Sequence, residues 1–188
     1  AKTRIVMGYF QQLHFVNNVA EEIELLIRKS SRFSILDTCQ FRRRIAVHIR
    51  LGDYRTSTSA KNFHGLTSIG YYLRAIENLH QQTGMEEVLI ISDEPDVAEE
   101  LILPKINNKT FSVHVDRTGD AIQHLAKIAN SAAIVGSNST FSWWGAWLAT
   151  RKYRANVVMP RPWFADASIM MSKLMDTNWI LLERNLEL

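Results

Sequence analysis

The apolar residues of this chain recur with two periods, one typical of helices and one typical of buried strands. In residues 17–29 they fall three or four positions apart, with acidic residues early and basic residues late. This pattern predicts an amphipathic helix whose charges match its dipole. Residues 45–49 form a nearly continuous apolar run with β-branched members, which predicts a buried strand. The polar residues 30–44 are predicted to connect the two.

From residue 45 onward, strand and helix patterns alternate. The predicted strands are residues 45–49, 87–91, 111–115, 132–135, 155–159 and 179–182. Helices are predicted from a cap at Thr67 or Ser68 to Gly84, from Pro95 to about residue 103, across 120–130, from the turn at 136–142 to 148, and across 168–175. Residues 54–64 lack periodicity and are predicted to form a loop, a candidate lid. The alternation predicts an α/β fold: a mostly parallel sheet with helices on both faces.

Composition narrows the class of protein. The chain has 188 residues, 46% of them hydrophobic, and a net charge of +3. Its one dense basic run is residues 42–44, and no basic stripe with interleaved aromatic residues argues for nucleic acid. Cys39 is the single cysteine, which excludes an intrachain disulfide and fits a reducing compartment. No apolar run approaches the roughly 20 residues that span a bilayer.

Candidate chemistry begins directly after the predicted strand 45–49. Arg50, Gly52, Asp53 and Tyr54 stand where a parallel strand would give way to a loop. Ligands of open α/β sheets bind outside the carboxyl ends of the strands. An Arg at that edge suits a phosphate, because its planar fork donates two parallel hydrogen bonds. The alternative is a structural ion pair between Arg50 and Asp53.

A second candidate element is the turn at residues 136–142, which is rich in small and hydroxyl residues. It is predicted to lead from a strand into a helix, whose first N–H groups and partial positive charge suit phosphate. Ser139 and Thr140 add hydroxyl donors. The segment matches neither the Walker pattern nor the dinucleotide fingerprint. The alternative is plain helix capping by Ser137, Asn138 or Ser139.

Asp93 follows the predicted strand 87–91 and completes the set. A cation, a helix N-terminus and a carboxylate at one sheet edge suit a purine diphosphate. A carboxylate accepts the N1 and N2 hydrogens of guanine, so Asp93 is a candidate guanine contact. Alternatively, Asp93 caps the helix that begins at Pro95. The aromatic residues are expected to serve packing: Trp143, Trp144, Trp147, and Tyr9 and Phe10 within residues 8–11. The alternatives are contact of residues 8–11 with a ligand and a sugar-stacking role for one of the tryptophans.

Two segments carry a resemblance to a known family. Residues 48–54, His-Ile-Arg-Leu-Gly-Asp-Tyr, resemble the H-x-R-x-G-D-Y motif of the α-1,2-fucosyltransferases, glycosyltransferase family 11. Residues 137–148, Ser-Asn-Ser-Thr-Phe-Ser-Trp-Trp-Gly-Ala-Trp-Leu, resemble the second long motif of that family. Shorter matching segments occur in the expected order at residues 8–11, 64–66, 91–93 and 160–164. The resemblance covers almost the whole chain.

The resemblance implies transfer of L-fucose from GDP-β-L-fucose to the 2-hydroxyl of a galactose in bacterial surface-glycan synthesis, with inversion. It implies no cofactor and no essential metal. The implied partners are GDP-fucose and a galactose-containing acceptor glycan, and the implied location is the cytoplasm, with peripheral attachment to the inner membrane allowed. The implied fold is the Rossmann-like, donor-binding half of a GT-B-like protein. We therefore divide the chain into an N-terminal helix and connector, residues 1–44, and a nucleotide-sugar-binding domain, residues 45–188.

The same resemblance assigns roles to individual residues. The predicted catalytic residues are Arg50, His48 and Asp53. The predicted substrate-binding residues are Arg50, Asp93, Asn138, Ser139, Thr140 and Phe141. Arg50 would grip the β-phosphate and stabilise the departing GDP, while His48 and Asp53 would position Arg50. The turn at residues 139–141 would bind phosphate through backbone and hydroxyl groups. No metal ligand is predicted.

The chain departs from the family pattern at two places. Leu51 stands where family members often carry a second Arg. The Gly-Gly-Leu-Gly-Asn-Gln turn, which lies near the acceptor in the family, is absent, as if the N-terminal third were missing. The alternative to an enzyme is therefore a non-catalytic fragment that binds a GDP-sugar or a glycan.

The catalytic base is the least defined part of the prediction. The carboxylates and histidines near the predicted donor site are His48, Asp53, His64 and Asp93, and none forms an obvious acid–base pair. A base within hydrogen-bond reach would help to deprotonate the acceptor hydroxyl. We expect that leaving-group stabilisation by Arg50 and the turn dominates, and that no single base in this chain is indispensable.

Overall fold

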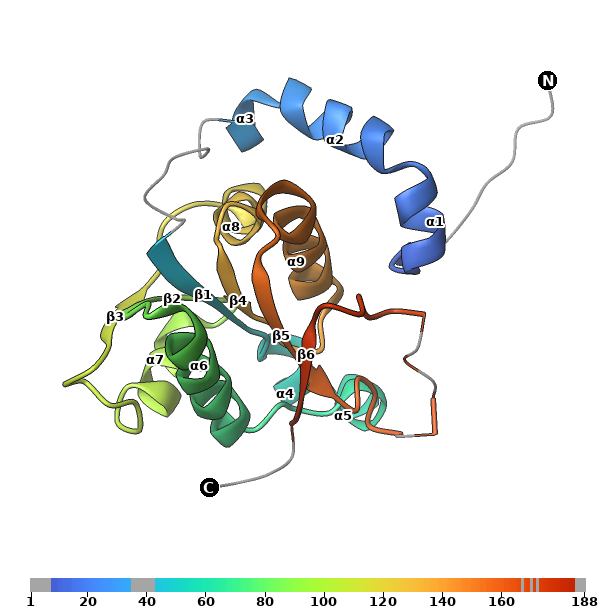
Figure 1. The fold of residues 1–188 in the computed structure, drawn as a ribbon. Helices are drawn as coiled ribbons and strands as arrows, with labels where there is room; N and C mark the ends of the chain where they lie inside the picture. Colours follow the sequence, from blue (N-terminus) through green and yellow to red (C-terminus); the bar gives the residue numbers. More distant parts are fainter. Residues whose placement is uncertain (1–7, 35–42, 167, 170, 172, 185–188) are drawn as a thin grey trace, which may run out of the picture.

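The computed structural model describes residues 8–34, 43–166, 168–169, 171 and 173–184 (Figure 1). Within these residues one six-stranded sheet has the order β3-β2-β1-β4-β5-β6, and every neighbouring pair is parallel. The strands are β1 (Arg44–Ile49), β2 (Glu87–Ser92), β3 (Ser112–Val115), β4 (Ala133–Val135), β5 (Asn156–Arg161) and β6 (Ile180–Glu183). The helices are α1 (Leu13–Asn18), α2 (Ala20–Lys29), α3 (Ser31–Ser34), α4 (Gly52–Thr56), α5 (Thr58–His64), α6 (Ile69–Thr83), α7 (Pro95–Ile102), α8 (Ala121–Ala129) and α9 (Thr140–Tyr153).

The central strands are apolar on both faces because helices cover both. Side chains of a strand point alternately to the two faces. Ile90 of β2 accordingly belongs to the hydrophobic core that contains α6 and α7. Its neighbours Leu89 and Ile91 belong to the opposite core, with α8 and α9. The predicted α/β class, with a parallel sheet covered on both faces, is confirmed.

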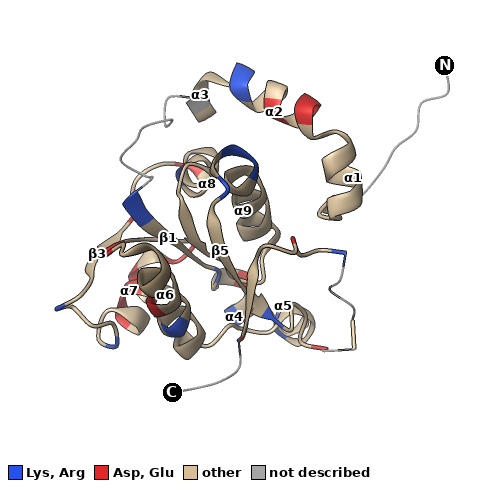
Figure 2. Ribbon diagram, viewed as in Figure 1, with Lys and Arg blue, Asp and Glu red and all other residues tan. Residues whose placement is uncertain are grey.

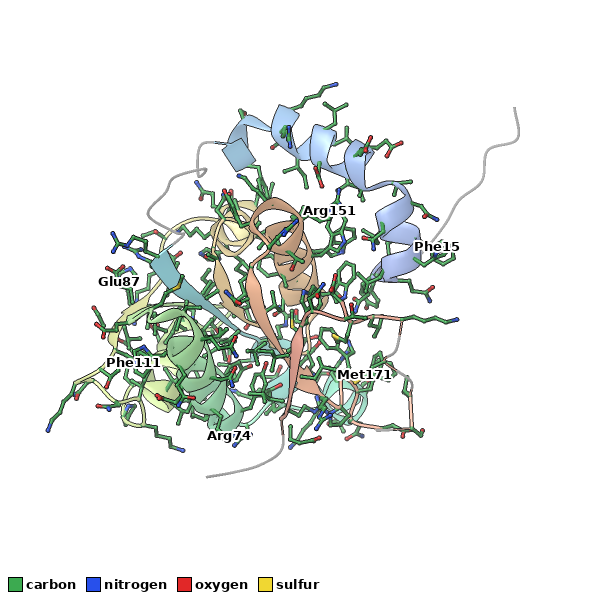
Figure 3. All side chains as sticks on the ribbon, in the orientation of Figure 1. Phe15, Arg74, Glu87, Phe111, Arg151 and Met171 are labelled. Atoms are coloured by element: carbon green, nitrogen blue, oxygen red, sulfur yellow. The ribbon has the colours of Figure 1, made fainter. Side chains whose placement is uncertain are left out.

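The chain before β1 forms an arch of helices over α8 and α9 (Figure 1). Ile23 and Ile27 of α2 pack against the core of that layer. Arg151 of α9 lies toward α2 and donates to Glu24 at 2.8 Å (Figure 3). The predicted helix at residues 17–29 is interrupted at Val19, which separates α1 from α2. The proposed boundary between residues 44 and 45 stays a prediction.

Two local predictions were wrong. The segment at residues 54–64, predicted as a loop, contains most of α4 and all of α5. These helices are too short to show a repeating apolar pattern in the sequence. Ser57 caps α5 by accepting from the Ala60 N–H at 3.4 Å. The predicted helix at 168–175 is replaced, in its described residues, by turns and bends. There the Lys173 carbonyl accepts from the Leu13 N–H at 3.1 Å, which ties this segment to α1.

The surface carries charges of both signs. Acidic and basic residues share α2, and Lys and Arg are scattered over several elements (Figure 2). Among the described residues, no helix is both long and apolar enough to cross a membrane.

Candidate functional site

The sheet places the two sequence motifs side by side. β1 and β4 are neighbours at the centre of the sheet, and the strand order reverses between them. Such a reversal is the switch point at which open α/β sheets bind ligands, outside the carboxyl ends of the strands. Arg50 follows β1, and the turn at residues 136–139 joins β4 to α9. The predicted convergence of Arg50, the turn and Asp93 on one edge is therefore present.

Arg50 lies between two carboxylates. Its Nη2 and Nε donate to Asp53 Oδ1 at 2.7 and 3.2 Å, and its Nη1 lies 3.1 Å from Asp93 Oδ2. Burial disfavours the guanidinium charge, but Asp93 and Asp53 outweigh it and hold the pKa of Arg50 above its usual value. The side chain is 34% exposed, and each of its three nitrogens faces one of the two carboxylates. The predicted Arg50–Asp53 ion pair is present, and binding of phosphate by Arg50 stays a prediction.

Both carboxylate oxygens of Asp93 contact the loop after β1. Its Oδ1 accepts from the Leu51 N–H at 2.9 Å, and its Oδ2 pairs with Arg50. A Cβ at Gly52 would lie 2.4 Å from Asp93 Oδ2, so the motif needs glycine at this position. The alternative role of Asp93 as a cap of α7 is wrong, since the N-cap residue is Glu94 and it makes no side-chain cap bond. Reading of guanine by Asp93 stays a prediction.

His48 is buried and joins β1 to the start of α9. Its Nδ1 lies 2.6 Å from Ser142 Oγ and 3.2 Å from Ser137 Oγ. Its ring packs on Phe141, with 4.9 Å between the centroids. Burial, followed by the nearby charge of Arg50, lowers the pKa of His48 to about 3. His48 is thus a neutral residue of the interior that fixes the turn beside Arg50.

The turn before α9 is held by its own hydroxyl groups. Ser139 is the N-cap and accepts from the Phe141 N–H at 3.2 Å, so the capping alternative is confirmed for Ser139. Ser142 Oγ accepts from the Ser137 N–H at 3.0 Å. Thr140 Oγ1 donates to Gln11 Oε1 at 2.6 Å. The start of this 14-residue helix provides N–H groups and positive potential at the same edge as Arg50.

Asn138 connects three loops around the turn. Its Nδ2 lies 2.8 Å from the His64 carbonyl, 3.1 Å from the Trp163 carbonyl and 3.2 Å from that of Gly65. Its Oδ1 accepts from Thr67 Oγ1 at 3.0 Å. The Asn138 side chain, predicted to bind substrate, therefore makes hydrogen bonds within the protein. Its direct contact with a ligand stays a prediction.

Arg184, at the end of β6, was not predicted. Its side chain is 2% exposed, and its Nη1 donates to the carbonyls of His64 and Trp163 at 2.5 and 3.4 Å. Within the described part of the chain, no carboxylate forms an ion pair with it. Burial lowers the pKa of Arg184 accordingly. We call Asn138 and Arg184, which bind the same carbonyls, the carbonyl clip. One indication of Arg184 was present in the sequence, a basic residue close to the end of a predicted strand.

Tyr54 links Arg50 to the carbonyl clip. Its hydroxyl donates to the Asn138 carbonyl at 3.1 Å, and its ring stacks on His64 with 4.5 Å between the centroids. The guanidinium of Arg50 lies 5.7 Å from the centre of the Tyr54 ring. Burial raises the pKa of Tyr54 to about 12, so its hydroxyl stays protonated.

The aromatic predictions divide into two groups. Trp143 and Trp147 are buried in the core, as predicted, and Trp144 packs at its edge. Tyr9 and Phe10 were expected to pack, but both are exposed. Their packing role is wrong, because they lie at the rim of a cavity beside the turn.

Comparisons with known proteins agree with the motifs. The family model described as glycosyl transferase family 11 matches residues 2–183. Over 145 residues the chain is 33% identical to "O-antigen biosynthesis glycosyltransferase WbnK" of Escherichia coli, covering 77% of this chain and 46% of the relative. Over 147 residues it is 29% identical to "Alpha-1,2-colitosyltransferase" of Escherichia coli, covering 74% and 48%. The chain thus spans about half the length of these curated relatives.

Solved structures show more distant similarity. POFUT1 in complex with GDP has a TM-score of 0.47 and 19% identity, covering 69% of this chain and 46% of that one. The glycosyl transferase family 9 protein from Veillonella parvula has a TM-score of 0.40 and 10% identity, covering 86% and 40%.

Proposed function

Because the chain belongs to glycosyl transferase family 11, we propose that it binds a GDP-sugar and transfers the sugar to an acceptor glycan. The preferred reaction moves L-fucose from GDP-β-L-fucose to the 2-hydroxyl of a galactoside, with inversion and without an essential metal. The printed names of the two relatives refer to O-antigen biosynthesis and to α-1,2 transfer of colitose. They support a role in bacterial surface-glycan synthesis and a deoxysugar donor. We place this role in the cytoplasm or at the inner membrane as part of the proposal.

The observation that carries the proposal is the convergence of Arg50 and the start of α9 at the switch point of the sheet. A diphosphate needs a cation and N–H donors that are already in place. Asp53 and Asp93 hold the guanidinium, and the His48–Ser142 bond holds the helix start. Groups fixed in this way stabilise developing charge without reorganising.

The reaction then follows from these positions. The acceptor oxygen forms a bond to the sugar C1 while the bond from C1 to the β-phosphate oxygen breaks, and the electron pair leaves with GDP. Arg50 and the N–H groups of the turn stabilise the added negative charge on the phosphate. The acceptor hydroxyl gives its proton to a base or to water. Inversion results because the acceptor attacks the face opposite GDP.

Two measurements test the proposal. Calorimetry with GDP, ADP and UDP measures nucleotide selectivity, and we expect GDP to bind best. Product analysis with GDP-fucose and a β-galactoside should then show an α-1,2-linked product, with GDP-colitose as a competing donor. A folded protein that binds none of these nucleotides would contradict the proposal.

The second candidate is a non-catalytic module that binds a GDP-sugar or a glycan. It is favoured by one observation: the chain covers 46% and 48% of the two relatives. GDP binding without any transfer or donor hydrolysis would support the module over the enzyme.

A further inference from the structure

A cavity of about 810 Å³ lies beside the charged cluster of Arg50, Asp53 and Asp93. Its walls include the aromatic side chains of Tyr9, Phe10, Tyr54, Phe63, His64 and Phe164. We call it the aromatic cavity. Its volume lies in the range of small-molecule sites, and such sites combine apolar and aromatic walls with a few polar groups.

The aromatic cavity adjoins the proposed phosphate site through two shared residues. Tyr54 lines the cavity and also lies under the guanidinium of Arg50. Thr140 lines the cavity and is the first residue of α9. A ligand in the cavity would therefore lie next to a diphosphate bound at Arg50 and the helix start.

The walls of the cavity carry no fixed charge. Among the described residues that line it, no Asp, Glu, Lys or Arg occurs. Burial lowers the pKa of His64 and raises that of Tyr54 to about 12, so both are neutral near pH 7. An uncharged wall suits an uncharged ligand, since an ion moved there would lose hydration without gaining a partner.

The remaining chemistry of the walls matches a sugar ring. One face of a pyranose presents C–H bonds, which pack on the electron-rich face of an aromatic ring. Phe63 and Phe164 form such a wall, with ring centroids 5.1 Å apart. Gln12 and Asn18 also line the cavity, and their side-chain amides can exchange hydrogen bonds with sugar hydroxyls.

We propose that the aromatic cavity binds an uncharged sugar ring of the acceptor. This assignment rests on the proposed glycosyl transfer. The diphosphate and the acceptor would then occupy two neighbouring subsites, one charged and one neutral. Phe63, Phe164 and Tyr9 would hold the face of the sugar ring, and the amides of Gln12 and Asn18 would bind its hydroxyls.

Binding can be tested without turnover. Saturation-transfer NMR measures the affinity of methyl β-galactoside for the chain, with and without GDP, and calorimetry measures GDP affinity. Phe63→Ala and Tyr9→Ala alter exposed side chains, 51% and 72% accessible, so folding should be retained. Each should weaken galactoside binding by about three- to tenfold, the value of one aromatic contact, and leave GDP affinity unchanged. Leu26→Ala, at an exposed apolar position outside the cavity, is the matched control.

A charged sugar provides the control for the neutral walls of the cavity. Methyl β-galacturonide adds a carboxylate to the same ring and should bind more weakly than the galactoside. Equal galactoside affinity in both cavity variants and the parent would overturn the assignment, as would a parent that binds GDP but no galactoside. If GDP-fucose affinity falls while galactoside affinity holds, the cavity belongs to the donor sugar and the assignment is wrong. Failure of the parent to bind GDP contradicts the proposed function instead, because galactoside binding is measured separately.

Discussion

Arg50 illustrates how one residue can be structural and functional at once. Two carboxylates hold its guanidinium, yet the side chain is partly exposed at the switch point. An Arg held by one carboxylate on each side keeps one orientation before any ligand arrives. The cost is a local excess of negative charge, from Asp53 and Asp93, that an incoming phosphate must tolerate. In the proposed site Arg50 is thus needed twice, as a donor to phosphate and as a screen for its neighbours.

Replacing Arg50 by Ala should weaken GDP binding or transfer by roughly tenfold to a hundredfold or more. A charge-assisted hydrogen bond contributes about 1.5–3 kcal/mol, and the exposed carboxylates would add repulsion. Calorimetry with GDP measures the loss. Arg55→Ala removes the same charge from a partly exposed 3.6 Å ion pair with Glu94, and should lower GDP affinity by at most about fivefold. A folded R50A protein with parental affinity and rate would exclude the phosphate role, and an unfolded one would favour a structural ion pair.

Asp93→Asn separates positioning from base recognition. The amide would place an NH₂ either against the Leu51 N–H or against the Arg50 Nη1, both of which are donors. We expect the affinities for GDP and ADP to fall together, by about tenfold, the loss of one hydrogen bond to a charged group. Calorimetry with both nucleotides checks this. A fall in the GDP-over-ADP preference alone would instead support direct contact between Asp93 and guanine.

His48 should make the fold sensitive to acid. Its pKa is lowered to about 3 in the folded chain from 6.5, so between these values the unfolded state binds more protons. Stability is therefore fully present above pH 6.5 and falls as the pH drops toward 3, by at most about 1.4 kcal/mol per pH unit from this group. Urea unfolding from pH 4 to 8 measures the slope. His48→Asn removes the titration and should flatten that slope, whatever its stability at pH 8. An unchanged slope would show that His48 is not the group responsible.

At the scale of single residues, the sequence predicted the groups that stand in motifs and missed those that act through tertiary contacts. Arg50, Asp53 and Ser139 follow strand ends or begin a helix, and their places are set by local pattern. Asn138 was predicted as a substrate contact from its motif, but its binding of distant carbonyls was not, and neither was Arg184, because no spacing rule identifies such partners. The roles of Tyr9 and Phe10 depend on which part of the protein surface their segment packs against. The periodicity of the sequence does not determine that position.

At the scale of elements, the carbonyl clip joins the α5–α6 loop, the end of β5 and the turn before α9. Its donors, Asn138 and Arg184, bind carbonyls of His64, Gly65 and Trp163. His64 is the last residue of α5, whose final carbonyls have no partner within the helix, and Gly65 and Trp163 lie in the segments after α5 and β5. The clip therefore supplies side-chain donors to carbonyls at the ends of these elements.

Arg184→Met should destabilise the fold by about 1–3 kcal/mol, since it leaves buried carbonyls with fewer donors. Urea unfolding at constant pH measures the change. Arg161→Met is the matched control: it removes the exposed 2.8 Å ion pair with Glu183 at the end of β5 and should cost at most about 1 kcal/mol. Equal losses in the two variants would show that burial of Arg184 adds nothing.

Elements were predictable in proportion to their own pattern. The central strands, and α6 with caps at Ser68 and Gly84, were predicted because each buries a continuous apolar stripe. The helices α4 and α5 escaped because they are short and mostly polar, and their stability comes from packing below Arg50 and from the Ser57 cap. Residues around Met171 were predicted as a helix because their apolar spacing is helical, but these side chains pack on α9 from turns.

At the scale of the whole molecule, alternating strands and helices allow few arrangements, because parallel strands require crossovers of one hand. The layered fold was predictable for that reason. The position of the arch of α1–α3 was not, since it depends on contacts such as Arg151 with Glu24 and Trp147 with Asn17. The aromatic cavity, the proposed acceptor subsite, is lined by residues of both this arch and the α5 region, where sequence pattern is least informative.

The fold also determines which of the predicted candidates for the catalytic base can reach a ligand. His48 is buried and bonded to Ser142, and Asp53 is paired with Arg50. Only His64 among the predicted candidates lines the aromatic cavity, and its lowered pKa leaves it neutral and able to accept a proton.

We expect His64→Gln, and likewise His48→Asn and Asp53→Asn, to lower the transfer rate by less than about a hundredfold, the lower limit for loss of a general base. The physical reason is that departure of GDP needs charge stabilisation from Arg50 and the turn, whereas the acceptor proton can pass to water once the bond has formed. Single-turnover rates with saturating GDP-fucose, alongside GDP affinity, measure this. Gln at position 64 keeps a hydrogen-bonding group in the cavity, so acceptor binding should be largely retained. A thousandfold fall at one residue, with donor affinity intact, would identify that residue as the base and contradict the dominance of leaving-group stabilisation.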